Sequence, residues 1–110
     1  MNYEIILTDN FKNEAKKLSK KYSSLKLELT ALGEILQENP TFGTSLGNNI
    51  YKIRLAIESK GKDKSGGARV ISLVKVTQET IYLLSIFNKS EQESISQKDI
   101  SEILKTENLL

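Results

Sequence analysis

The chain has 110 residues, of which 38% are hydrophobic and 27% charged, with a net charge of +2 and neither cysteine nor histidine. This composition is typical of one globular domain over residues 1–110, and it excludes a disulfide framework, a thiolate metal site and any mechanism that needs imidazole. The chain has no apolar run of about 18 residues and no basic, apolar leader, so we expect a cytoplasmic protein without a membrane span or signal peptide.

The first part of the chain predicts a strand followed by an amphipathic helix. Residues 3–8 form a short run of residues that favour strands. Apolar residues then recur at helical spacing, at Phe11, Ala15, Leu18 and Tyr22. The lysines around them are Lys12, Lys16, Lys17, Lys20 and Lys21. We interpret these lysines as the solvent-facing side of the helix and assign them no site.

A second helix is predicted directly after the first. Leucines repeat at helical spacing, at Leu25, Leu29, Leu32 and Leu36. Asn39-Pro40 ends this pattern, because the residue before a proline disfavours the helical conformation. Ser23 and Ser24 separate the two patterns and can cap the second helix. Two helices joined by so short a turn form an antiparallel hairpin.

The pattern changes to strands after a turn-rich connection over residues 41–49. Alternation then places one set of residues on one face of a strand, namely Tyr51, Ile53, Leu55 and Ile57. The opposite face carries Lys52, Arg54 and Ala56. Residues 68–76 and 80–87 are nearly continuous apolar runs, which predicts central strands that are covered on both faces.

The chain ends with a short helix, predicted over residues 97–105. Ser96 and Asp99 resemble a capping box with Asp in place of Glu, and Ile95 and Ile100 are spaced as a hydrophobic staple. The complete order is β-α-α-β-β-β-α, with the last three strands forming an antiparallel meander. This order predicts an α+β fold with helices packed on one face of a sheet.

The positive charges gather in the middle of the chain. Residues 1–51 carry six lysines and six acids, and residues 76–110 carry three lysines against six acids. Residues 52–75 carry seven cations and two acids, which gives this segment a net charge of +5. A basic segment between a neutral and an acidic one indicates a surface that attracts a polyanion.

The cationic strand in this segment is the strongest candidate for a binding site. Lys52 and Arg54 share a face because they are two residues apart in a strand. Arg69 on the next strand joins them if the pairing sets it opposite or diagonal to Arg54. Cations without an acidic partner repel one another, and a phosphate would supply the missing anion. The alternative is an ordinary solvated strand face.

The loop over residues 58–67 is rich in glycine and lysine, but it lacks the Gly-Lys-Ser/Thr ending of a phosphate-binding P-loop. Lys60, Lys62 and Lys64 are candidates for non-specific, salt-sensitive contacts with the phosphate backbone of a nucleic acid. The alternative is a solvated loop that happens to be basic.

Lys89 directly follows the last predicted strand, and residues just past a strand end often carry function. It can lean toward the basic face, although a polar turn that leads into the last helix explains its position equally well. Glu91 and Glu93 come next along the chain. We interpret them as plain solvated acids rather than as an acid–base pair.

Several segments together resemble the RelE/ParE superfamily of toxins, and most closely the RelE/HigB-type members of bacterial type II toxin–antitoxin systems. These segments are Tyr-Lys-Ile-Arg-Leu, Gly-Gly-Ala-Arg-Val-Ile and Ile-Tyr-Leu-Leu-Ser-Ile-Phe-Asn-Lys-Ser-Glu-Gln-Glu. The similarity covers nearly the whole chain. It implies a small ribonuclease that cuts mRNA, commonly in the ribosomal A site. It also implies a co-expressed antitoxin that silences the toxin in a hetero-oligomeric complex.

The resemblance implies roles for four cations. The family's basic strand pair falls on Lys52 and Arg54, its next arginine on Arg69, and its basic position after the last strand on Lys89. Lys52 would transfer a proton as a ribose 2′-hydroxyl attacks the adjacent phosphate, with its pKa lowered by the neighbouring arginines. The arginines would stabilise the phosphorane, and Lys89 would hold the phosphate or assist the leaving oxygen. No metal or other cofactor is implied.

Two other functions stay open at this point. Some members of the family carry a tyrosine or histidine where this chain has Ile95 and Ser96. That difference, together with the second surface offered by the helical hairpin, favours a non-catalytic ParE-type toxin that binds a protein such as DNA gyrase. A plain RNA-binding module is the third possibility, and it would bind RNA in a salt-dependent way without cutting it.

Overall fold

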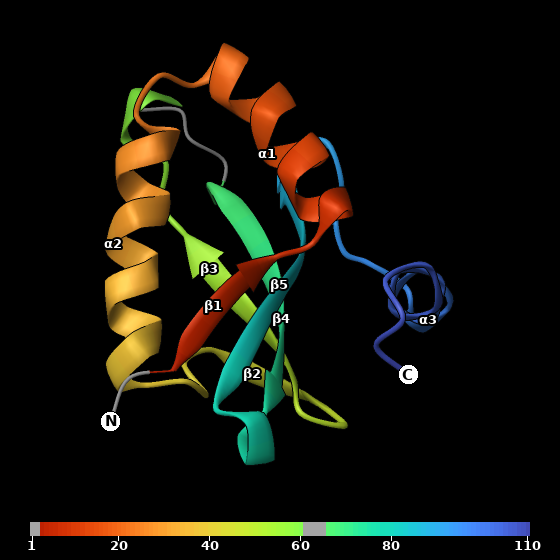
Figure 1. Ribbon diagram of the computed structural model, residues 1–110. Helices are drawn as coiled ribbons and strands as arrows, with labels where there is room; N and C mark the ends of the chain where they lie inside the picture. Colours follow the sequence, from red (N-terminus) through yellow and green to blue (C-terminus); the bar gives the residue numbers. More distant parts are fainter. Residues whose placement is uncertain (1–2, 61–65) are drawn as a thin grey trace.

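A computed structural model describes residues 3–60 and 66–110, and Figure 1 shows their arrangement. The strands are β1 (Glu4–Leu7), β2 (Thr44–Gly47), β3 (Ile50–Leu55), β4 (Ala68–Lys75) and β5 (Thr80–Asn88). The helices are α1 (Asp9–Lys21), α2 (Leu25–Glu38) and α3 (Gln97–Thr106), with short 3-10 turns η1 (Glu58–Lys60) and η2 (Val76–Gln78). None of the helices in these two ranges is long and apolar enough to cross a membrane.

The strands form one mixed sheet in the order β1-β5-β4-β3-β2. β1 runs parallel to β5, whereas the other neighbouring pairs are antiparallel. β4 and β5 are buried along nearly their whole length, as their continuous apolar runs predict. The α+β class and the predicted meander of β3, β4 and β5 are therefore confirmed.

The sheet has one strand more than the sequence predicts. The connection over residues 41–49, which its glycines mark as turns, contains β2 at the sheet edge beside β3. All four residues of β2 are exposed, so no alternation of buried side chains reveals the strand in the sequence. Gly43, with φ of 116°, allows this pairing because a Cβ there would lie 2.7 Å from the Lys52 carbonyl oxygen.

Helices α1 and α2 cover one face of the sheet (Figure 1). Thr8 begins α1, because its side-chain oxygen accepts a hydrogen bond from the Phe11 N–H while its hydroxyl donates to the Leu83 carbonyl of β5. The helical side of the core consists of Phe11, Leu18, Leu25, Leu32 and Leu36. The sheet side includes the predicted inner face of the cationic strand, at Ile53, Leu55 and Ile57.

The start of α2 differs from the prediction of a serine cap. Ser24 occupies the position before the first helical residue, but its side chain makes no capping hydrogen bond. Its hydroxyl lies 3.1 Å from the Glu28 carboxylate and 2.8 Å from the Ser59 hydroxyl. Ser59 is distant in the sequence, so no local pattern could show that it competes with the cap.

Helix α3 lies on the opposite face of the sheet, whereas the sequence predicts all helices on one face. The cluster beneath α3 consists of Ile50, Ile71, Leu73, Leu84, Phe87, Ile100 and Leu104. Because β4 and β5 are apolar on both faces, the second face also needs a cover. The predicted start of α3 is confirmed, since Ser96 accepts a hydrogen bond from the Asp99 N–H at 3.1 Å. Ile95 and Ile100 pack in this same cluster.

A β-bulge in β5 decides which residues face α3. The pairing of β4 with β5 shifts by one residue between Ile71 and Ser72. Leu83 consequently packs beneath α1 and α2, whereas Phe87 packs beneath α3. In a regular strand these two residues would share a face, because side chains alternate. Beyond the bulge Phe87 pairs with Arg69 of β4, and paired residues lie on the same side of the sheet.

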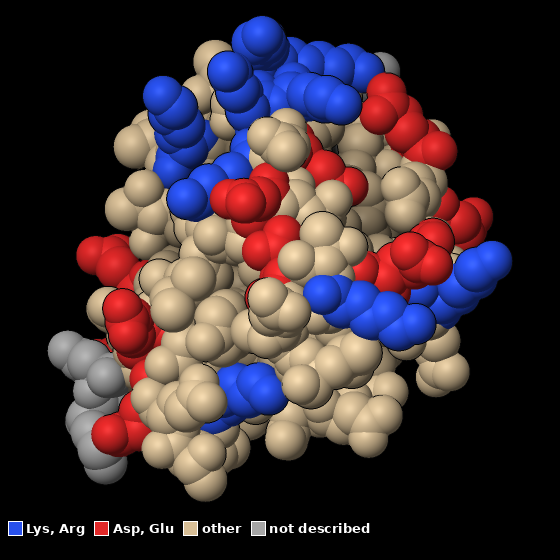
Figure 2. All heavy atoms as spheres, turned by 45° about the vertical axis from the view of Figure 1, so that its right-hand side comes forward, with Lys and Arg blue, Asp and Glu red and all other residues tan. Residues whose placement is uncertain are grey.

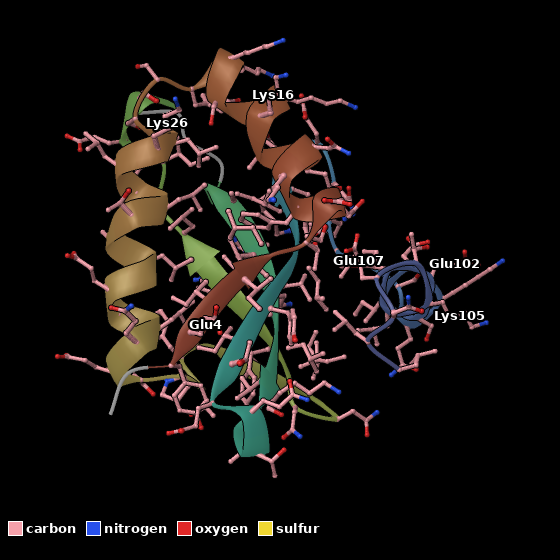
Figure 3. The ribbon with its side chains drawn as sticks, viewed as in Figure 1. Glu4, Lys16, Lys26, Glu102, Lys105 and Glu107 are labelled. Atoms are coloured by element: carbon pink, nitrogen blue, oxygen red, sulfur yellow. The ribbon has the colours of Figure 1, made fainter. Side chains whose placement is uncertain are left out.

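The end of α3 is attached to the start of α1. Glu107 follows α3 and points toward the first turn of α1 (Figure 3). Its carboxylate accepts hydrogen bonds of 3.4 Å from the backbone N–H groups of Asp9 and Asn10. These N–H groups have no partner within the helix and favour a negative charge. This contact helps to hold α3 on its face of the sheet.

Two leucines of α2 test the packing of the helical hairpin. Leu32 is 3% exposed and Leu27 is 77% exposed. We expect Leu32→Ala to lower the free energy of unfolding by about 2–5 kcal/mol, because it leaves a cavity in the core. Leu27→Ala should change it by less than about 0.5 kcal/mol. Urea denaturation followed by circular dichroism measures both, and equal effects would contradict the packing described above.

Candidate functional site

The pairing of β3 with β4 brings three cations to one face of the sheet. Arg54 lies directly opposite Arg69, and Lys52 lies opposite Ile71. Lys52 and Arg54 point away from the helical hairpin, because Ile53, between them, is buried beneath it. Of the two arrangements that the sequence leaves open for Arg54 and Arg69, the structure has the directly opposed one.

The three cations differ in exposure and in partners. Arg54 is exposed, Lys52 is half-buried and Arg69 is only 4% exposed. The Nη1 atom of Arg69 donates hydrogen bonds to the carbonyl oxygens of Gly66 and Ala68. Within residues 3–60 and 66–110, none of the three cations forms an ion pair with a carboxylate.

The guanidinium of Arg69 carries a desolvated charge. Its burial, and to a smaller extent the charge of Arg54, lower its pKa from the usual value. An arginine nevertheless stays protonated in proteins, so this lowering measures a cost to the folded state rather than a loss of charge. An anion bound between the two arginines would offset that cost, because its charge attracts both guanidinium groups.

Lys89 lies beside Arg69 at the end of β5. Its backbone N–H donates to the Gly67 carbonyl at 3.0 Å, which extends the pairing of β4 with β5 by one residue. A Cβ built on Gly66 would lie 3.2 Å from the Lys89 Cγ and 3.4 Å from the Arg69 Nη2. The two cationic side chains therefore flank the same glycine.

An acid four residues further along the chain binds the ammonium group of Lys89. Its Nζ lies 2.6 Å from Oε1 of Glu93, whose side chain is 88% exposed. The hydrogen bond from Lys89, and then its charge, lower the pKa of Glu93. Glu91 similarly pairs with Lys21 of α1 at 3.0 Å, and this contact raises the pKa of Lys21.

Glu91 and Glu93 are exposed to solvent, as predicted, but each also forms an ion pair that was not predicted. Residues 89–93 are not helical, so the spacing of four residues between Lys89 and Glu93 does not indicate their pair from the sequence. The pair of Glu91 with Lys21 depends on how α1 packs on β5, and no local pattern indicates it.

The lysines proposed for the loop are described only in part. Lys62 and Lys64 lie outside the described residues, as does the side chain of Lys60. Their contacts with RNA remain predictions. The loop begins at η1, where the Glu58 N–H donates to the Glu28 carboxylate of α2 at 2.6 Å. This contact fixes the start of the loop beside the helical hairpin.

The glycines that end this loop were not assigned a role from the sequence. Gly66 and Gly67 both have positive φ angles, of 72° and 61°. A Cβ on Gly67 would lie 2.3 Å from the Leu55 carbonyl oxygen, so only glycine allows β4 to begin so close to the end of β3. Two consecutive glycines directly before a strand were the available signal.

The positions that carry tyrosine or histidine in some RelE/ParE toxins have structural roles here. Ile95 packs in the apolar cluster beneath α3, and Ser96 caps that helix. Neither side chain supplies an acid or base near neutral pH. Among the residues that the structure describes, no group of three or more His, Cys, Asp or Glu side chains could hold a metal ion.

Exposed lysines cover the outer side of α1, as predicted, and Figure 2 shows basic side chains gathered over this helix. Glu14 of the same helix turns inward instead. Its Oε1 accepts hydrogen bonds from the Ser85 hydroxyl at 2.7 Å and from the Ile86 N–H at 3.2 Å. The helix thus joins its acid to β5 and leaves its lysines in solvent, and we still assign these lysines no site.

A cavity of about 480 Å³ lies on the same sheet face as the cations but at a different place. It lies between α3 and the β2–β3 hairpin, and its walls include Leu46, Ile50, Ile100 and Leu104. Lys75 is on its wall, but none of the four candidate cations is. The candidate cations therefore form a surface that is separate from this apolar cavity.

Arg69→Met tests whether the buried guanidinium weakens the fold. We expect the free energy of unfolding to stay the same or to rise by up to about 2 kcal/mol, because methionine fills similar space without a desolvated charge. The exposed Arg54→Met is the control and should change it by less than about 0.5 kcal/mol. In urea denaturation at pH 7, a clear loss of stability in Arg69→Met would show that the hydrogen bonds to Gly66 and Ala68 support the fold.

The ion pair of Lys89 and Glu93 predicts a pH dependence. Because the pKa of Glu93 is lowered in the folded protein, the pair is complete above the pKa of an unfolded glutamate and is lost as the pH falls through the lowered value. Lys89→Met should return the pKa of Glu93 to its ordinary value. Carbon-13 NMR titration of the Glu93 carboxyl measures this change, and identical titration curves for both proteins would exclude the ion pair in solution.

Comparisons with known proteins agree with the fold described above. Residues 4–109 match the family model described as the RelE toxin of the RelE/RelB toxin–antitoxin system. A mutant of the E. coli toxin RelE in the free state has a similar fold, with a TM-score of 0.66, 20% identity, and coverage of 96% of this chain and 98% of that chain. The intact E. coli RelBE toxin–antitoxin complex contains a chain that matches with a TM-score of 0.59 and 21% identity; the match covers 76% of this chain and 93% of that chain.

No curated protein sequence matches. Since the family model spans nearly all of it, the chain belongs to the RelE family of toxins of toxin–antitoxin systems.

Proposed function

We propose that this RelE-family toxin is a metal-independent endoribonuclease that cleaves mRNA on the ribosome and so inhibits translation. The observation that carries the proposal is the direct opposition of Arg54 and Arg69, with Lys52 on the same face. These cations lack a carboxylate partner among the described residues, and an RNA phosphate is the anion that would offset their charge. RelE-family toxins are typically ribosome-dependent endoribonucleases, which supports this reaction class.

The proposed reaction is an attack within the RNA itself. The ribose 2′-oxygen forms a bond to the adjacent phosphorus while the bond from phosphorus to the 5′-oxygen breaks. The 2′-hydroxyl loses a proton and the leaving 5′-oxygen gains one, which gives a 2′,3′-cyclic phosphate and a 5′-hydroxyl. Negative charge grows on the phosphorane oxygens between these events, and it is this charge that the protein must stabilise.

Arg69 is suited to stabilise the phosphorane because its position is set before RNA binds. Its burial and its hydrogen bonds to two backbone carbonyls hold the guanidinium in place. A guanidinium has five N–H donors, so it can bind a phosphate while Nη1 keeps its backbone partners. A donor that is already positioned costs no reorganisation during the reaction. Arg54, opposite it and exposed, would add a second charge.

The lysines are the candidates for proton transfer. Lys52 is half-buried on the face shared with the arginines, so it is assigned to the proton of the attacking 2′-hydroxyl. Lys89 would hold the scissile phosphate or assist the leaving oxygen. Its present partner, Glu93, is exposed, and an exposed ion pair contributes little to stability. A phosphate can therefore replace Glu93 at little cost.

We also propose that a cognate antitoxin protein binds this chain and silences it in a hetero-oligomer. The support is family membership and the likeness of the fold to a chain of the E. coli RelBE complex. The antitoxin would cover the cationic face or insert a segment of its own between the helices. The first mode would keep RNA away from Arg54 and Arg69, because it covers the face on which they lie.

A ParE-type toxin that binds DNA gyrase without cutting RNA is the second candidate. Two observations favour it: Ile95 and Ser96 have structural roles rather than chemical ones, and α2 presents an exposed apolar surface. That surface includes Leu27, which is 77% exposed, and Ile35, which is 43% exposed. Inhibition of gyrase supercoiling without cleavage of mRNA would select this function.

An assay of mRNA cleavage by this protein on purified, mRNA-programmed ribosomes tests the proposal. We expect Arg69→Met to lower the cleavage rate about 100- to 1,000-fold, the usual loss when one transition-state donor is removed. Lys26→Ala is the control, because this exposed lysine is on α2, which covers the other sheet face, and it should cleave like the wild type. Wild-type cleavage by folded Arg69→Met would exclude its assigned role. RNA binding without a cut product would instead indicate an RNA-binding module.

A further inference from the structure

We propose that Gly66 is a positioning residue, whose missing side chain allows Lys89 to lie close enough to Arg69 for one phosphate to contact both. This inference rests on the proposed function and adds to it a residue outside the set of four cations. Gly66 supplies no charge and no proton. Its effect would come only from the space that it leaves between two side chains.

A Cβ built on Gly66 would lie closer to Lys89 than to Arg69. A Cβ on this residue would lie 3.2 Å from the Lys89 Cγ, closer than ordinary van der Waals contact, and 3.4 Å from the Arg69 Nη2, which is ordinary contact. Lys89 would therefore have to move first. An added methyl group would push the lysine outward while the distance to the guanidinium stayed acceptable.

The contacts of the two side chains also indicate that Lys89, rather than Arg69, would move. Arg69 is 4% exposed and is held by hydrogen bonds to Gly66 and Ala68, so it has no room to give way. The Lys89 side chain is 26% exposed, and among the described residues its ammonium group binds one solvent-exposed acid, Glu93. A side chain at position 66 would thus change the separation of the cations by moving Lys89 alone.

The backbone carbonyls of Gly66 and Gly67 form hydrogen bonds with both Arg69 and Lys89. The Gly66 carbonyl accepts a hydrogen bond from Arg69, and the Gly67 carbonyl accepts one from the Lys89 N–H. Gly66 is exposed, so no core packing demands the absence of a side chain. Its φ of 72° is a separate reason for glycine, and a test must distinguish that backbone strain from the spacing of the cations.

Gly47 offers a matched control for the backbone strain. It also has a positive φ, of 88°, but no atom lies within 4 Å of a Cβ built there. Gly47→Ala therefore introduces similar strain without a new contact, whereas Gly66→Ala introduces both. If Gly66→Ala does not fold, Gly66→Asn replaces it, because asparagine tolerates this backbone conformation and carries the same Cβ.

The experiment is a double-mutant cycle in the ribosome-programmed mRNA cleavage assay, using the full chain. We expect Gly66→Ala to lower the cleavage rate about 3- to 10-fold through the displaced lysine, and Gly47→Ala to cleave like the wild type. In a Lys89→Met background, Gly66→Ala should cause no further loss, because no ammonium group remains to be displaced.

The cleavage rates distinguish displacement of Lys89 from backbone strain at Gly66. An equal loss from Gly66→Ala in both backgrounds would show that it acts through strain, and the inference would fail while the proposed ribonuclease stands. Wild-type cleavage by Gly66→Ala, or by Lys89→Met alone, would overturn the inference in the same way. If the wild-type protein cuts no mRNA at all, the proposed function itself fails.

Discussion

The close contact between the end of β3 and the start of β4 is the constraint on which the cationic face depends. Gly67 lies against the Leu55 carbonyl oxygen, at a distance that no side chain would allow. The pairing that begins there sets Leu55 opposite Ala68 and, one step along, Arg54 opposite Arg69. A slip of one residue would turn Arg69 toward the core beneath the helices, because successive side chains point to opposite faces. The electrostatics of the site thus follow from a steric requirement of the backbone.

The sheet face away from the helical hairpin is divided between two uses. At one end α3 covers an apolar cluster, and the carboxylate of Glu107 attaches this helix to the start of α1. At the other end the cations stand without a described acidic partner, apart from Lys89. Arg69 is rigid and desolvated, whereas Lys89 holds an exposed acid that a phosphate can replace. A rigid donor beside an exchangeable one suits the proposed binding of an RNA phosphate at this surface.

Local patterns in the sequence were sufficient for the α+β class, for the order of the main helices and strands, and for the shared face of Lys52 and Arg54. Helical and strand periodicities depend only on residues a few positions apart, so they can be read without knowing the fold. The same holds for the proline-marked end of α2, which stops at Glu38, and for the serine that begins α3. These features survive folding because no distant residue competes for the groups that form them.

The remaining features required the folded chain. The opposition of Arg54 and Arg69 depends on strand register, and the exposed edge strand β2 has no pattern of burial that could announce it. The face covered by α3 and the pairing of Lys21 with Glu91 depend on elements separated by most of the chain. Such contacts form only when packing brings distant residues together, and their free energy comes from that packing rather than from local propensity. For this reason the individual cations were visible in the sequence, whereas the tertiary structure decided that Arg54 lies opposite Arg69 and that Lys89 lies beside Gly66.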